Sequence, residues 1–433
     1  MPKIQDYAAI GDGRSVALIS RNGSLDWLCW PRFDSPSLFA GLLDARIGGT
    51  WSISPTETAQ VERRYLDDTN VLQTRFHTST GSLVLTDFMP AASEEEKRRI
   101  LWPEQELMRR VECERGEIEV QVHFDPRPDY GRVRVALRDA GKLGLRIDRG
   151  SHLITLLSDI KLTPAAEGGA SARFRLGTGA SATFSLLYSS EGPAVLPPPS
   201  ELFSQKFALT TEWWRRWAAR CRYSGPYRDQ VVRSALMLKL LSYAPSGAIV
   251  AAPTTSLPER VGGDLNWDYR FCWLRDAAFT VRALFGLGYR EEAEAFVSQG
   301  LGMTRMNAPY LLGTMLTPNR DRAKLLGVLA HFVNGWIFSF IYIAAFHAWG
   351  AATWWLGALA GLVHSSFVLT AGLPLLPALH PRMANEQYGP TVARQLEPPG
   401  FLALHYGART PISIVIAHLV YGAILGGFYV FPG

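Results

Sequence analysis

The segment from Gly262 to Asp276 holds the densest set of residues that could do chemistry. It contains three carboxylates, two arginines and four aromatic residues within fifteen positions. Aromatic rings stack on the C–H faces of a sugar, while Asp and Arg side chains bind neighbouring hydroxyl groups. The first turn of a helix with interior ion pairs and core aromatic residues would have the same composition. The residue types leave both interpretations open.

Two kinds of hydrophobic pattern precede this segment and must position it. Residues 1–192 alternate apolar and polar side chains in short runs separated by turn residues, which predicts an antiparallel β-sandwich. The expected strands are Ser15–Ser20, Gly23–Trp30, Val71–His77, Ser82–Phe88, Ile118–Phe124, Arg132–Leu137, His152–Ser158, Ala172–Leu176 and Ala182–Ser189.

A proline-rich run, Pro193–Pro199, marks a boundary after this region, and residues 200–300 then show a helical period. The expected helices are Glu201–Arg222, Tyr227–Tyr243, Trp273–Leu287 and Arg290–Gln299. The segment rich in carboxylates and aromatic residues would therefore be the loop that leads into the third of these helices.

The last third of the chain has a different composition. No Asp, Glu, Lys or Arg occurs from Leu325 to Leu379, enough chain for two membrane crossings and a turn. We expect a membrane domain over residues 303–433 with spans at about 325–348, 353–375 and 412–431, and a turn at Gly350. A buried helical hairpin in a soluble core is the alternative.

Basic residues around these spans predict an orientation. Arg320, Arg322 and Lys324 precede the first span, and Arg382, Arg394 and Arg409 lie between the second and third. Basic loops stay in the cytoplasm, so the positive-inside rule places both of these loops, and the N-terminal domain, on the cytoplasmic side of the inner membrane. The opening residues also lack the basic and apolar pattern of a signal peptide.

Composition excludes several classes of protein. The chain is 47% apolar and 19% charged, which argues against general disorder. Its four cysteines lie far apart, so neither a zinc ribbon nor a disulfide scaffold is indicated. The net charge is +5, but the basic residues form no dense patch along the sequence, so we do not expect nucleic acid as a partner.

Several motifs resemble bacterial glycoside hydrolase family 15, the glucoamylase-like and trehalase-like enzymes. They are Ile4–Asp12, Leu18–Leu28, Pro31–Ser35, Ala248–Glu259 and Asn266–Ala277, in this order along the chain. The resemblance covers residues 4–300 and implies a β-sandwich followed by an (α/α)6 barrel, and inverting hydrolysis of α-glucosides. It also implies that Trp273, Arg275 and Asp276 hold the glucose at the cleavage site. We expect Trp267 and Asp268 beside them and no cofactor.

The chain departs from the family pattern in two ways. Asp264-Leu265 stands where a basic residue would precede the Asn. The helical period ends near residue 300, so the barrel would be an incomplete fragment, and the family's catalytic acid and base, two glutamates from later helices, have no counterpart. Glu259, Asp264, Asp268 and Asp276 are the local carboxylates, and none suggests an acid–base pair across a closed pocket. An unclosed barrel would also expose apolar helix faces, which the membrane part or a second copy of the chain could cover.

The C-terminal third resembles an uncharacterised family of bacterial integral membrane proteins. The resemblance rests on Thr317–Lys324, Trp354–Leu359, His380–Ala384, Arg394–Phe401 and Ala417–Gly422. It begins near Gly302, so a junction between the two resemblances is expected at residues 300–303.

Three histidines, His331, His364 and His418, lie inside the expected spans. Ionisable residues within a membrane suggest a function, and three imidazoles could bind a metal or haem. Hydrogen bonding between helices, helped by neighbouring glycines, is the alternative. No carboxylate accompanies them, so we expect no metal.

The sequence thus predicts a family 15-like protein fused to a membrane domain and inactive as a hydrolase. Its partners would be an α-glucoside sugar and the lipid bilayer. A membrane-anchored sugar-binding or assembly module is one alternative. An integral membrane protein whose N-terminal domain is a passenger is the other.

Overall fold

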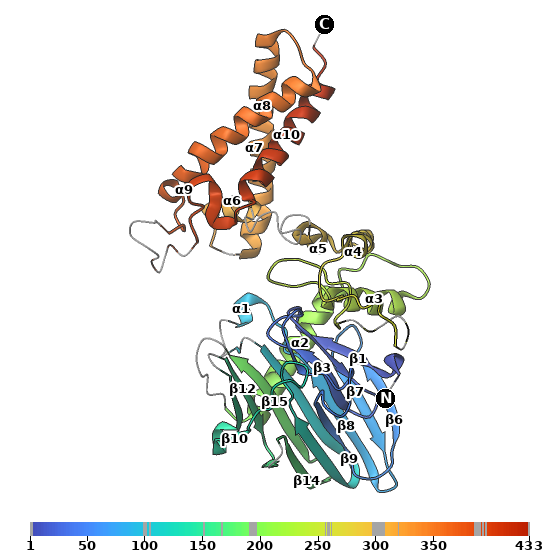
Figure 1. Ribbon diagram of the computed structural model, residues 1–433. Coiled ribbons are helices and arrows are strands. Elements are labelled where there is room, and N and C mark those ends of the chain that lie inside the picture. The colour runs from blue at the N-terminus through green and yellow to red at the C-terminus, as the bar shows by residue number, and fades with distance from the viewer. Residues whose placement is uncertain are drawn as a thin grey trace. The chain divides into compact units, whose positions relative to one another are not determined.

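A computed structural model of the chain describes residues 3–97, 102–103, 105–149, 152–165, 168–189, 197–255, 257, 260, 262–296, 308–318, 320–384, 391, 394 and 396–431. The chain separates into two compact units, Met1–Ala293 and Glu294–Gly433. The first combines a large β domain with a few helices, and the second is helical (Figure 1). Each unit is described by itself below.

The first unit begins with an antiparallel sheet of 15 strands, which confirms the predicted antiparallel β domain. Its strands are β1 (Ala8–Gly11), β2 (Val16–Ile19), β3 (Ser24–Cys29), β4 (Ser37–Phe39), β5 (Thr50–Pro55), β6 (Gln60–Tyr65), β7 (Leu72–His77), β8 (Gly81–Phe88), β9 (Gln105–Asp125), β10 (Arg138–Asp139), β11 (Leu145–Arg149), β12 (His152–Ser158), β13 (Thr163–Pro164), β14 (Ala170–Gly177) and β15 (Ser181–Ser189).

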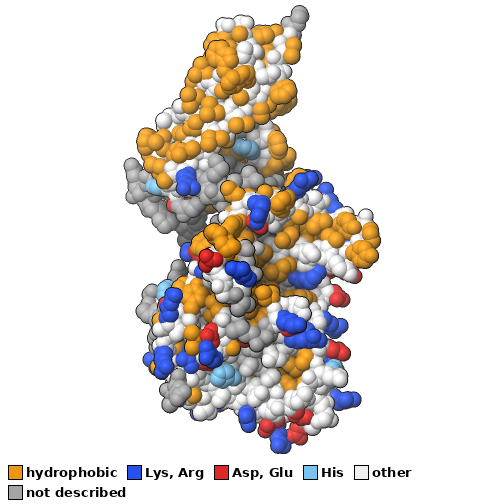
Figure 2. All heavy atoms as spheres, turned by 45° about the vertical axis from the view of Figure 1, so that its right-hand side comes forward, with side chains coloured by type: hydrophobic (Ala, Val, Ile, Leu, Met, Phe, Trp, Pro, Cys, Tyr) orange, Lys and Arg blue, Asp and Glu red, His pale blue; other side chains and the backbone are white. Residues whose placement is uncertain are grey.

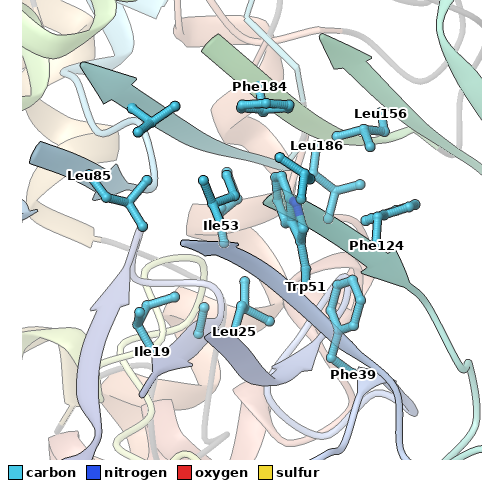
Figure 3. Packing of buried hydrophobic residues seen from close by; sticks show 14 of the residues in the cluster. Ile19, Leu25, Phe39, Trp51, Ile53, Leu85, Phe124, Leu156, Phe184 and Leu186 are labelled. Carbon is cyan, nitrogen blue, oxygen red and sulfur yellow. The ribbon is translucent and has the colours of Figure 1, made fainter. Parts of the chain in front are cut away.

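One long strand, β9, organises this sheet. Its first half pairs with β8 and β15, and its second half pairs with β5 and β14. The strands on the two halves face each other, so alternate side chains from both fill one core. Trp51 and Phe124, at 5.6 Å between ring centroids, meet Phe184 and Leu186 there (Figure 3).

A buried ion pair crosses this core. Arg109 on β9 bonds Asp87 on β8 at 2.8 Å, and it also donates to the carbonyl oxygens of Trp51 and Gly23. Both charged side chains are 0% exposed. The guanidinium thus has a carboxylate and two carbonyl oxygens as acceptors, which compensate its charge in a position that solvent does not reach.

The prediction of a strand at Arg132–Leu137 is wrong. These residues follow a turn in which Asp129, Tyr130 and Gly131 all have positive φ, and they form no ladder. Val135 and Leu137 pack against the core, which produces the alternation without a paired neighbour. Strands β1, β4, β5, β6, β10, β11 and β13 were not among the predicted strands.

Four helices follow the β domain: α2 (Pro199–Ala218), α3 (Arg228–Leu240), α4 (Leu274–Leu287) and α5 (Arg290–Ala295), the last of which crosses the division between the units after Ala293. The four predicted helices agree with them to within a few residues, while the proline-rich boundary at 193–199 and the end of the last predicted helix lie partly outside the described residues. Trp214, Trp217 and Leu236 form a second core with residues of the β domain such as Ala9 and Phe33. The helices are therefore docked on the β domain rather than tethered to it.

The second unit contains α6 (Ala308–Leu316), α7 (Arg320–Trp349), α8 (Trp354–Phe367), α9 (Leu373–Leu379) and α10 (Thr410–Phe428). Three helices are long and apolar enough to cross a membrane: Leu325–Trp349, Trp354–Leu379 and Thr410–Phe428. They coincide with the three predicted spans, and Gly350 forms the predicted turn with φ +68°. Their surfaces are mostly hydrophobic (Figure 2), which is compatible with spans by length and composition.

Glycines set how closely α8 and α10 approach. A Cβ at Gly357 would lie 2.0 Å from the Gly422 carbonyl oxygen, and one at Gly361 would lie 2.1 Å from that of His418. Two glycines four residues apart on each helix thus allow direct backbone contact, a common packing mode of membrane helices.

Candidate functional site

The β domain holds the loop that carries the predicted site. Trp27 on β3 donates a 2.9 Å hydrogen bond from Nε1 to the Pro253 carbonyl oxygen. The amides of Ala251 and Ala252 donate to the carbonyl oxygens of Phe271 and Tyr269, at 3.1 and 2.9 Å. The two ends of the loop therefore lie side by side, and one end is attached to a buried strand.

Arg270 is the strongest connection between this loop and the β domain. Its guanidinium donates to Asp268 at 2.8 and 3.0 Å and to the Ser35 carbonyl oxygen at 2.9 Å. The side chain is only 7% exposed. Burial by itself would raise the pKa of Asp268, but the hydrogen bonds and charge of Arg270 hold that pKa below its usual range.

Three aromatic rings cluster around the start of α4. Tyr269 and Trp273 stack with centroids 5.5 Å apart, and Trp267 meets Trp273 edge-on at 6.3 Å. Trp273 donates from Nε1 to the Asp268 carbonyl oxygen at 3.1 Å, which fixes its ring. Trp267 remains 48% exposed, so its face is open to a ligand.

Arg275 and Asp276 lie in the first turn of α4. They pair with each other at 3.2 Å, with side chains 75% and 38% exposed. A carboxylate in a first helical turn is stabilised by the positive end of the helix dipole. Both groups remain accessible, and their hydrogen-bonding capacity is far from exhausted.

The predicted site residues therefore separate into two groups. The structure brings Trp267, Asp268 and Trp273 together, and Asp268 is engaged by Arg270. Arg275 and Asp276 follow at the helix start and are open to solvent. Among the other local carboxylates, Asp264 is exposed, and Glu259 lies outside the described residues.

Two residues that shape the site were not singled out from the sequence. Arg270 positions the loop, and Tyr269 supplies the ring that stacks on Trp273. The Asp-x-Arg spacing of Asp268 and Arg270 signals a local ion pair. It does not signal that the arginine is buried against carbonyls more than two hundred residues away.

Comparison with known proteins gives this loop a context. Residues 1–164 match the family model of trehalase-like N-terminal domains, and residues 225–321 match that of glycosyl hydrolases family 15. A trehalase of Thermoplasma volcanium is 36% identical over 323 residues, covering 71% of this chain and 48% of that protein. A trehalase of Mycolicibacterium smegmatis is 37% identical over 315 residues, covering 69% of this chain and 47% of that protein.

These matches support a trehalase-like, family 15 domain. The chain spans about half the length of the curated relatives it matches. The family 15 match extends to residue 321, past the junction expected at 300–303, whereas the compact units divide after Ala293. The resemblance of the C-terminal third to a membrane-protein family is not confirmed by a family match, and the junction stays a prediction.

Two carboxylates of α5 are also engaged in ion pairs. Glu292 on α5 accepts from Trp217 Nε1 at 2.6 Å and pairs with Lys239 at 3.2 Å. Burial would raise the pKa of Glu292, but Lys239 and Trp217 hold it below its usual range. Glu291 is exposed and pairs with Arg220 at 2.9 Å.

Two of the three histidines in the predicted spans, His364 and His418, make contacts between helices. The ring centroids of His364 on α8 and His418 on α10 are 4.5 Å apart, in an edge-to-face arrangement. The Nδ1 atom of His364 is 3.1 Å from the Tyr342 hydroxyl on α7. His418 Nδ1 contacts the Ile414 carbonyl oxygen at 2.7 Å. Among the described residues, no group of three His, Cys, Asp or Glu side chains could hold a metal ion. The contact of His364 with Tyr342 agrees with hydrogen bonding between helices.

Proposed function

We propose that this protein is a membrane-anchored, trehalase-type family 15 protein that does not hydrolyse α-glucosides as it stands. Three spans would hold it in the inner membrane, with the family 15 part in the cytoplasm. The observation that carries the proposal is the state of the carboxylates around the site. Asp268 and Glu292 are held as ion pairs with lowered pKa values.

Inverting hydrolysis needs a protonated acid and an ionised base on opposite faces of the sugar, about 6.5–9.5 Å apart. A carboxyl that donates a proton at neutral pH needs a raised pKa, which comes from an apolar or negatively charged surrounding. Asp268 and Glu292 have the opposite surroundings. Asp264 is exposed, and Asp276 lies in the first turn of α4 with its side chain 38% exposed. The described helices thus supply the setting for binding a sugar without the pair that would cleave it.

Glucose release from membranes that contain the protein tests this proposal. Trehalose, maltose and starch oligomers are supplied, and the wild type is compared with an Asp276→Ala variant. We expect equal release from both. Release by the wild type that clearly exceeds that of the variant would refute the proposed inactivity.

Binding without hydrolysis is a second candidate function, and the open ring of Trp267 favours it. Trp267 sits beside two ordered aromatic rings and the accessible Arg275–Asp276 pair, an arrangement suited to a sugar with both an apolar face and hydroxyl groups. The ligand would be an α-glucoside such as trehalose.

Titration calorimetry with trehalose tests this second candidate on the full chain in detergent. Trp267→Ala should abolish the binding heat. Trp349→Ala is a matched control, because Trp349 is 47% exposed and belongs to the second unit. Saturable binding that survives Trp267→Ala would contradict the assignment, as would a wild type that does not bind.

A third candidate assigns the function to the membrane helices, with the family 15 part as a passenger. The half-buried contacts of His364 with Tyr342 and His418 are the observation that favours it. A phenotype that is unchanged when residues 1–300 are deleted would support this candidate.

A further inference from the structure

One face of α4 is apolar and largely exposed among the described residues of the first unit, where the Arg290 guanidinium lies 5.8 Å from the centroid of the Phe285 ring. Leu274, Ala278, Val281 and Phe285 recur at intervals of four, three and four residues, which places them in one stripe along the helix. Leu274 is 68% exposed and Phe285 is 57% exposed. Only Ala277 and Leu284 of this helix are fully buried, and they lie on another side.

Arginines border this stripe. Arg275 and Arg282 are both exposed and lie on the same edge of it, since they are seven residues apart. Hydrophobic and basic side chains are intermixed on the surface of this helical part (Figure 2). An apolar stripe flanked by arginines is the pattern of a helix that lies in a membrane interface, because arginine can extend its charge to the headgroups.

Neighbouring residues extend the same surface. Phe271 in the loop is 52% exposed, and Phe279 on α4, beyond the arginine edge, is 67% exposed. Aromatic rings are favoured at the level of lipid headgroups. Arg290, at the start of α5, is a further exposed basic residue.

We propose that the stripe of α4, formed by Leu274, Ala278, Val281 and Phe285, docks on the anionic surface of the membrane in which the chain is anchored. The proposal rests on the membrane anchoring proposed above. The segment between α5 and the first candidate span has on the order of 30 residues, so the first unit stays within reach of the bilayer. Tethering at this distance makes even weak interfacial binding effective.

Charge favours lipid over a second copy of the chain. If the stripes of two copies packed together, Arg275 and Arg282 of both would approach each other, and like charges in an interface oppose association. Anionic headgroups would instead neutralise them. On the orientation predicted from the basic loops, the first unit faces the cytoplasmic leaflet, which carries the anionic lipids.

Docking leaves the proposed sugar site accessible. Asp276 is two residues from Leu274 and nine from Phe285, so its side chain lies on roughly the opposite side of α4 from both. Asp276 would therefore face away from the bilayer, whereas Arg275 lies at the border between the sugar-binding face and the lipid-binding face.

The test places an environment-sensitive fluorophore on the stripe. The full chain, with Cys221 and Cys272 replaced by Ser, receives NBD at Phe285→Cys. Ile47→Cys in the β domain is the control, because Ile47 is also 57% exposed. Cys29 and Cys113 are buried and do not react. The labelled protein is placed in nanodiscs of phosphatidylcholine, with or without phosphatidylglycerol, that contain a lipid with a nitroxide headgroup.

We expect the nitroxide to quench NBD at position 285 about twofold or more beyond the quenching at position 47, and more strongly with phosphatidylglycerol. Arg282→Gln should reduce the difference. Equal quenching at the two positions would overturn the proposal. So would a disulfide between two Phe285→Cys copies without lipid quenching, which would identify a second copy as the occupant.

A second labelled variant, Leu274→Cys, lies on the same stripe and is 68% exposed, so it keeps the test decisive if the first does not fold. Carbonate-resistant sedimentation of the same proteins examines membrane anchoring separately. Loss of anchoring refutes the proposed membrane function, while intact anchoring without quenching refutes only the docking of α4.

Discussion

Replacing Arg270 by Ala should release the loop that carries the candidate sugar site. The Ser35 carbonyl oxygen would lose its 2.9 Å donor in a buried position, at a cost of about 1–3 kcal/mol. The lost pair with Asp268, which is 33% exposed, adds about 1 kcal/mol at most. The free energy of unfolding of the first unit should therefore fall by about 1–4 kcal/mol, with roughly 2–4 °C in Tm for each kcal/mol.

Arg275→Ala provides a matched control. Arg275 lies five residues further along the chain and also pairs with a neighbouring carboxylate, but its side chain is 75% exposed. An exposed pair of this kind contributes about 0–1 kcal/mol. Arg270→Lys should be intermediate, because lysine keeps the charge but cannot reach Asp268 and Ser35 at once.

Hydrogen–deuterium exchange of the full chain in detergent gives the local readout, alongside thermal unfolding. The amides of Ala251 and Ala252, which donate to Phe271 and Tyr269, should lose protection in Arg270→Ala and keep it in Arg275→Ala. If the two variants have the same Tm and the same exchange at these amides, the reasoning that Arg270 holds the loop is wrong.

Three further predictions concern packing and charge. Gly422→Leu should disrupt the second unit, because a Cβ at this position would lie 2.0 Å from a backbone oxygen. Gly427→Leu should be tolerated, since the nearest atom to a Cβ there is a side-chain carbon at 3.6 Å. Size-exclusion chromatography in detergent distinguishes the two variants. Because the pKa of Glu292 is lowered in the folded state, its carboxylate stabilises the fold above the unfolded pKa of about 4.3, and this contribution is lost as the pH falls through the folded pKa. The difference in Tm between wild type and Glu292→Gln should therefore shrink below about pH 4. A difference in Tm that stays constant with pH would contradict this. Arg109→Met should cost about 3–5 kcal/mol by leaving Asp87 buried without a partner, and recovery in a double variant with Asp87→Leu would confirm the cause, measured by urea unfolding.

Local patterns in the sequence predicted a large part of the fold. The alternation of apolar residues predicted the antiparallel β domain, and the uncharged run from Leu325 to Leu379 predicted two of the three long apolar helices. These succeed because the periodicity of burial is a property of each element by itself. The strand expected at Arg132–Leu137 failed because alternation reports burial on one side and not the presence of a hydrogen-bonded neighbour.

The candidate site was located by its sequence, but the roles within it were not. Residue types and the family motif together predicted a sugar site formed by Trp267, Asp268, Trp273, Arg275 and Asp276. They could not show that Asp268 is neutralised by an arginine while Asp276 is open. That difference depends on burial, which is set by distant parts of the chain.

The sequence by itself determined the division into a β-rich part, a short helical part and three apolar helices, because each follows from composition and period along a continuous segment. Only the tertiary structure decided which of two nearby arginines positions the loop. Arg270 meets carbonyl oxygens of residues more than 230 positions away, and Arg275 meets solvent. The free energy of an ion pair depends on the water it loses, and that quantity exists only once distant segments have come together.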